Sequence, residues 1–150
     1  MEENISDHFS IEDVNHTDTG LENECPEIYA ANVIKLAETV LEPARVIVGP
    51  LLVDSWYRSP AVNRSVGGEA KSAHLEGRAA DVVPNGDVFA AFKKIVANHV
   101  MVPYDRIIHE KRHSEWIHIQ IAKDGDRPLG LALLGRPDDT GKIKYTRYGE

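Results

Sequence analysis

The sequence predicts a single α+β domain in which a small antiparallel sheet is flanked by helices. Two observations lead to this prediction. The chain has 150 residues, of which 42% are hydrophobic, enough to bury one core but not two. Segments with apolar residues every three or four positions alternate with short apolar runs that end at Gly or Pro. We therefore expect one domain over residues 1–150, with residues 1–25 as an acidic N-terminal segment of that domain.

Four segments have patterns typical of helices. Residues 11–16 follow Ser10, a residue type that caps helices, and begin with acids that favour the first turn. Residues 27–42 and 88–100 place their apolar side chains on one helical face. A shorter helix is expected over residues 61–66, after a Ser-Pro pair. We expect these helices to pack against the sheet.

Short apolar runs predict the strands. The expected strands cover residues 46–48 with 51–53, 78–83, 104–110, 116–122, 129–134 and 143–148. Polar turns separate the last four strands into two hairpin-like pairs, which predicts a mostly antiparallel sheet.

Composition excludes several kinds of function. The net charge of −7 argues against a nucleic-acid binder with a broad basic face, although residues 43–150 carry a net charge of +3. Cys25 is the single cysteine, so neither an internal disulfide nor a multi-thiolate metal site can form. The N-terminus has no export-signal pattern, and no apolar run approaches the roughly 20 residues of a membrane span. We expect a protein that is synthesised in the cytoplasm without a signal peptide and does not insert into a membrane.

Two sets of histidines are candidate metal ligands. The first is the HExxH string from His109 to His113, which in zincin peptidases supplies two ligands from one helix. The polar residues around it leave no apolar stripe for a helix, so we expect the string to lie at a hairpin turn. A zincin-like peptidase that uses His109 and His113 therefore remains the less favoured alternative.

The second set comprises His74, Asp81 and His118. Two imidazoles and one carboxylate give Zn²⁺ three ligands and leave a fourth position open, the arrangement of a catalytic zinc site. Gly77 can supply the turn that lets His74 and Asp81 face one ion.

The motif around these residues resembles a known family. Ser-x-His-x-x-Gly-x-Ala-x-Asp, which begins at Ser72, and a later Trp-x-His that ends at His118 are similar to the signature of the D-alanyl-D-alanine metallopeptidases. This family includes zinc D-Ala-D-Ala carboxypeptidases, L-Ala-D-Glu endolysins and the hedgehog signalling domain. The resemblance extends to residues 8–13, 55–63, 66–68 and 104–108, and is to the short phage or prophage branch.

The resemblance implies a role for each matching residue. His74, Asp81 and His118 would hold one Zn²⁺, and Glu115, three residues before the last ligand, would be the catalytic base. In a regular strand, however, residues 115 and 118 point to opposite faces, so Glu115 must stand at an irregular start of the strand. If it does not, Glu110 on the neighbouring strand is the substitute.

Arg58, Ser72 and His113 are further candidates near the expected cleft. The resemblance places Arg58 there, where its guanidinium would bind a substrate carboxylate or steady the oxyanion. Ser72 would orient His74 or contact the substrate, and His113 would assist the oxyanion.

These expectations combine into one function. The resemblance implies a monomeric, zinc-dependent peptidase that hydrolyses an amide bond in the peptidoglycan stem peptide, of either the D-Ala-D-Ala carboxypeptidase or the L-Ala-D-Glu endopeptidase type. A phage-type lysis enzyme that acts on the host cell wall fits this pattern. Besides the zincin-like peptidase, the alternative is a non-catalytic, hedgehog-like zinc-binding module.

Overall fold

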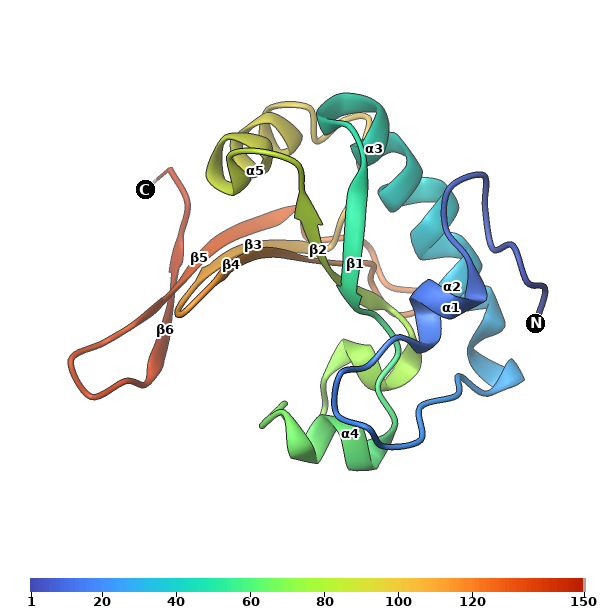
Figure 1. Cartoon of the computed structure of the whole chain (residues 1–150). Helices are drawn as coiled ribbons and strands as arrows, with labels where there is room; N and C mark the ends of the chain where they lie inside the picture. Colours follow the sequence, from blue (N-terminus) through green and yellow to red (C-terminus); the bar gives the residue numbers. More distant parts are fainter. Residues whose placement is uncertain (150) are drawn as a thin grey trace.

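A curved six-stranded sheet forms the centre of the protein, as Figure 1 shows for the computed structural model, which describes residues 1–149. The strands are β1 (Leu51–Ser55), β2 (Ala79–Pro84), β3 (Arg106–Lys111), β4 (Glu115–Gln120), β5 (Leu131–Pro137) and β6 (Ile143–Arg147). Their order across the sheet is β1-β2-β4-β3-β5-β6. Every neighbouring pair is antiparallel except β3 and β5, which are parallel. The prediction of an α+β domain with a mostly antiparallel sheet is confirmed.

Helices cover one face of this sheet. The longest regular helix, α5 (Val88–Ala97), packs against β2, β3 and β4, and α3 (Glu42–Val48) packs against α5. A short helix, α4 (Pro60–Ser65), lies on the other side of the sheet in Figure 1. The remaining helical segments are α1 (Ile11–Asn15), the 3₁₀ turns Glu27–Tyr29 and Ala73–Glu76, α2 (Ala30–Leu36) and a π-helical turn, Ala37–Leu41.

The prediction of a strand at residues 46–48 is wrong. These residues form the last turn of α3, which continues the helical path of α2 and is followed by the C-cap Gly49, where φ is 87°. The β-branched run that suggested a strand is overridden because Ala44, three residues after Leu41, extends the buried stripe of the helix. Pro43 is accommodated because it stands in the first turn of α3, directly after the π-helical turn.

The hydrophobic core lies between the sheet and the helical layer. Ile117 and Ile119 of β4 are buried against this layer, which includes Phe92 and Ile95 of α5. Successive side chains of a strand alternate between faces. The neighbours of Ile117 and Ile119, including His118, therefore point to the face away from the core.

Candidate metal centre and active site

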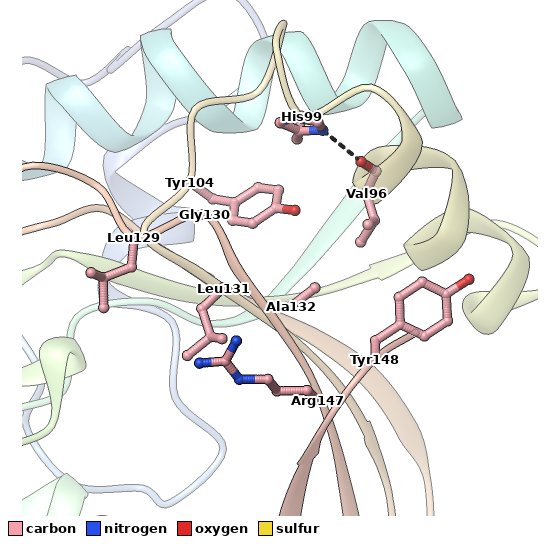
Figure 2. Close-up of a pocket in the computed structure, with 9 residues that line it drawn as sticks. All are labelled: Val96, His99, Tyr104, Leu129, Gly130, Leu131, Ala132, Arg147 and Tyr148. Carbon is pink, nitrogen blue, oxygen red and sulfur yellow. Dashed lines mark hydrogen bonds between the residues drawn. The ribbon is translucent and has the colours of Figure 1, made fainter. Parts of the chain in front are cut away.

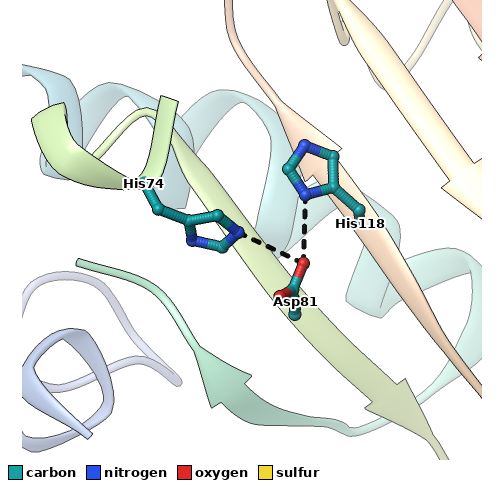
Figure 3. Close-up of side chains that lie close together, drawn as sticks. All are labelled: His74, Asp81 and His118. Atoms are coloured by element: carbon teal, nitrogen blue, oxygen red, sulfur yellow. Dashed lines mark hydrogen bonds and ion pairs between the residues drawn. The ribbon is translucent and has the colours of Figure 1, made fainter. Parts of the chain in front are cut away.

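Three elements bring His74, Asp81 and His118 together (Figure 3). Asp81 of β2 and His118 of β4 are direct partners in the antiparallel register, so their side chains share one face. His74 lies in the 3₁₀ turn Ala73–Glu76, which ends at Gly77 in the left-handed conformation with φ of 70°. A Cβ at Gly77 would also lie 2.8 Å from Val33 Cγ2, so both backbone and space favour glycine there.

The ligand atoms of the three side chains converge on one point. Oδ1 of Asp81 lies 3.0 Å from His118 Nδ1 and 3.3 Å from His74 Nε2. All three potential ligand atoms lie within 4.8 Å of one another, and His74 and Asp81 are buried. The sequence-predicted ligand set therefore forms one compact cluster.

The outer nitrogen of each imidazole has an oxygen partner, so the inner nitrogen, which lies against Asp81, can present a lone pair to an ion. His74 Nδ1 donates to the Trp56 carbonyl oxygen at 2.6 Å, so its buried Nε2 carries the lone pair and, among residues 1–149, lies near Asp81 Oδ1 without a hydrogen bond. His118 Nε2 lies 2.8 Å from Gln120 Oε1, to which it donates when Nδ1 faces the cluster. An outer N–H that is held by an oxygen is the usual state of a zinc-bound histidine. The donor set and its surroundings fit Zn²⁺.

The three side chains of the cluster shift one another's pKa values. Burial by itself raises the pKa of Asp81. His74 and His118 lower it by more than burial raises it, so the pKa of Asp81 lies well below its usual range. Burial lowers the pKa of His74, whereas the hydrogen bond and charge of Asp81 outweigh burial at His118 and raise its pKa. Asp81 is thus an ionised carboxylate at neutral pH, as a metal ligand must be.

Arg58 and Ser72 both contact the ligands. Arg58 Nη2 lies 3.0 Å from Asp81 Oδ2, and its Nε donates to Ser55 Oγ at 3.1 Å. Ser72 Oγ accepts a hydrogen bond from the backbone N–H of His74 at 3.2 Å and so caps the turn that carries this ligand. Both side chains are placed to orient the cluster, and their contact with substrate stays a prediction.

Glu115 is not brought to the cluster. The strand β4 is paired regularly with β3 from Glu115 onward, so it has no irregular start. Glu115 therefore points to the face opposite His118, and its Oε2 lies 2.8 Å from Nε2 of the buried His109. The expectation that Glu115 reaches the metal does not match this geometry.

Glu110 is on the same face as the cluster. In the register of β3 and β4, Ile108 is opposite His118 and Glu110 is opposite Trp116, so Glu110 is the diagonal neighbour of His118. Such neighbours are about 7–8 Å apart at Cα, within reach of long side chains. The Glu110 carboxylate also contributes to the raised pKa of His118. Glu110 is only 5% exposed, which is unusual for a glutamate.

The HExxH string has no zincin geometry. Residues 109–111 belong to β3, and His113, which is exposed, lies in the turn before β4. His109 is buried against the rings of Phe89 and Phe92 on the core side of the sheet. The string does not form the helix that a zincin site requires, in agreement with the expected hairpin turn.

A comparison with protein families identifies the group to which this site belongs. A family model described as Peptidase M15 matches residues 7–120. The chain belongs to the peptidase M15 family. This is the D-alanyl-D-alanine metallopeptidase family that the sequence motif indicates. M15 peptidases are zinc enzymes, and the matched segment contains all three candidate ligands and both candidate bases. A comparison with curated proteins finds no match.

Other features of the described residues lie apart from this centre. A second group of possible ligands, His16, Asp18 and Asp54, lies on the surface. A cavity of about 420 Å³ opens between the end of α5 and the strands β5 and β6, and shares no residue with the cluster (Figure 2). No helix within residues 1–149 is both long and apolar enough to cross a membrane.

Two residues near Glu110 were missed by the sequence analysis. Gly135 of β5 and Tyr145 of β6 lie beside its carboxylate. These residues reach Glu110 because β5 pairs with β3. This parallel pairing depends on contacts between distant segments, so no local sequence pattern indicates it.

Proposed function

We propose that this M15 peptidase is zinc-dependent and hydrolyses an amide bond in the peptidoglycan stem peptide. The observation that carries the proposal is the cluster of His74, Asp81 and His118, in which the buried His74 Nε2 is left for an ion. Three protein ligands leave a coordination position open, which is typical of catalytic rather than structural zinc.

The three ligands would hold Zn²⁺ through His74 Nε2, a carboxylate oxygen of Asp81 and His118 Nδ1. When bound, the ion supplies a Lewis acid that acidifies water and polarises the substrate carbonyl. Arg58 keeps Asp81 in place through its contact with Oδ2. Trp56 O and Gln120 Oε1 fix the two rings through their outer N–H groups.

Glu110 is the general base in this proposal. Amide hydrolysis requires a group that accepts a proton from the attacking water and gives one to the leaving amine. Glu110 shares the face of His118, whereas Glu115 is engaged by His109 on the other face. The alternation of side chains along β3 and β4 therefore favours Glu110 over Glu115.

The choice of substrate rests on the family resemblance. Four basic and two acidic residues lie between Trp56 and Arg78, so the segment that contributes Arg58 and His74 is locally positive and suits an anionic peptide. The D-Ala-D-Ala and L-Ala-D-Glu bonds are both candidates. The same resemblance supports a phage-type lysis enzyme that acts as a monomer on the host cell wall.

Digestion of purified peptidoglycan by the zinc-loaded protein, followed by mass analysis of the soluble fragments, tests the proposal. The mass of the fragments identifies the bond that is cleaved. The His74→Ala variant is the matched control and should release no fragments. A wild-type protein that binds zinc and releases none contradicts the proposal and favours the non-catalytic, hedgehog-like module.

A further inference from the structure

The β5–β6 hairpin lies outside the segment that matches the family model, residues 7–120, yet it contacts the candidate base. We propose that this hairpin is part of the active site, and that Gly135 and Tyr145 are positioning residues that hold the Glu110 carboxylate on the face of the metal cluster. The inference rests on the proposed function, because it assigns to the hairpin the placement of the base of that reaction.

The strand register places the three residues in one row. Glu110 of β3 is paired with Gly135 of β5, and Gly135 is paired with Tyr145 of β6. Paired residues in a sheet point to the same face. Glu110, Gly135 and Tyr145 therefore lie side by side on the face that carries His118.

Gly135 provides the space for the carboxylate. A Cβ at this position would lie 2.6 Å from Glu110 Oε2 and 3.1 Å from Glu110 Cδ, closer than van der Waals contact allows. Gly135 is absent from the glycines with positive φ, so its backbone conformation is open to any residue. Glycine is favoured here because a larger side chain would clash with the Glu110 carboxylate, and not because of the backbone conformation.

Tyr145 provides a hydrogen-bond donor to the Glu110 carboxylate and a ring that covers Gly135. Its hydroxyl lies 3.4 Å from Glu110 Oε1, and Arg112 Nη2 lies 3.4 Å from Glu110 Oε2. Tyr145 Cε1 would lie 3.0 Å from a Cβ at position 135, so the tyrosine ring packs directly over the glycine backbone. The ring and the missing side chain together form a slot for the carboxylate.

Burial makes these contacts important for the position of Glu110. A carboxylate that is buried without hydrogen-bond donors is costly, so a buried Glu110 depends on the donors around it. The two long contacts from Tyr145 and Arg112 satisfy one oxygen each and restrain the group without a tight ion pair. Such a carboxylate is held in place.

The test compares Tyr145→Phe and Gly135→Ala with the control Tyr148→Phe. The control removes the same atom from the same end of the chain, but the ring of Tyr148 packs on Phe89 and Phe92 of the helical layer. The measurements are kcat and KM on a soluble stem peptide, zinc content, and the position of Glu110 in crystal structures of the variants.

We expect kcat to fall about tenfold in Tyr145→Phe, the effect of one hydrogen bond to a charged group. In Gly135→Ala we expect a fall of about 100-fold, because the carboxylate is displaced by roughly 1 Å. KM and zinc content should remain within about twofold of wild type, since neither residue contacts the ligands. The Tyr148→Phe variant should retain the wild-type kcat.

Wild-type kcat in both variants, with Glu110 in its original position, would overturn the inference. A wild-type protein that digests no peptidoglycan would instead remove the proposed function. In that case the crystal structures still test the role of the hairpin: a Gly135→Ala variant that leaves the Glu110 carboxylate in place would show that the hairpin does not position it.

Discussion

The two faces of the sheet carry similar residues in different roles. On one face, Glu110 is the diagonal neighbour of His118 beside a potential metal cluster, and on the other, the half-buried Glu115 is hydrogen-bonded to the buried His109. The four residues occupy two adjacent strands. Their separation follows from the two-residue period of a strand, which sends the sequence neighbours His109 and Glu110 to opposite faces.

The comparison teaches that spacing along the chain is misleading at this site. Both the HExxH string and the Glu-x-x-His spacing of Glu115 and His118 describe pairs that would meet on a helix. In a strand, residues three apart lie on opposite faces, and the functional pair is formed across strands. On the core side, both ring nitrogens of His109 have partners. Its Nε2 contacts Glu115, and its Nδ1 lies 2.7 Å from Arg136 Nη2.

The largest expected difference between the two faces is in metal binding. His74→Ala should abolish stoichiometric zinc binding, because it removes one of three protein ligands. His109→Ala should retain zinc but lower the free energy of unfolding by about 2–4 kcal/mol, since it leaves Glu115 and Arg136 without their shared partner. The surface variant His113→Ala should change neither property. Zinc content by atomic absorption and denaturant unfolding measure the two effects, and zinc loss in His109→Ala alone would reverse our assignment.

A smaller effect is expected from the residue that supports Asp81. Arg58→Gln should weaken zinc binding about 10- to 100-fold, the usual effect of removing a group that orients a ligand. Arg64→Gln, which removes an exposed charge from the nearby helix α4, is the control and should bind zinc as wild type does. Competition with a chromophoric chelator measures both affinities. Equal affinities would assign Arg58 no part in holding the site.

The smallest effect concerns the pH dependence of stability. Burial lowers the pKa of His109 below its ordinary value, an effect that outweighs the opposing contact with Glu115. As the pH falls below about 6.5, the unfolded chain therefore binds a proton that the folded His109 resists, and stability decreases. In His109→Gln the decrease in unfolding free energy between pH 7 and pH 5 should be shallower than in wild type. Parallel curves for the two proteins would show that His109 does not contribute.

The metal ligands could be predicted from sequence because their motif is local in part and chemically specific. His74 and Asp81 are joined by one turn whose Gly77 is visible in the sequence, and His118 lies within a recognisable strand. The alternation of side chains along a strand identifies Glu110 and Glu115 as the two candidate bases. The decision between them depends on whether β4 is regularly paired at its first residue. That regularity is a property of its pairing with β3 and cannot be read from residues 115–118 alone.

Other parts of the fold depend on distant contacts. Residues 46–48 have a β-branched pattern, yet burial of the stripe that includes Leu41 and Ala44 keeps them helical. The parallel pairing of β3 with β5 brings Gly135 to Glu110 across 25 residues of sequence. Neither outcome is encoded in a local period, since each is decided by which surfaces become buried together.

The central claim, that the face of the sheet selects the base, is tested most directly by comparing kcat of Glu110→Gln and Glu115→Gln. Both variants should be assayed on peptidoglycan fragments at equal zinc content. Glu110→Gln should lose about 10²- to 10⁴-fold in kcat, the usual contribution of a general base. Glu115→Gln should retain a rate within a few fold of wild type, because its side chain points into the other face. A wild-type rate for Glu110→Gln together with an inactive, folded Glu115→Gln would contradict the account.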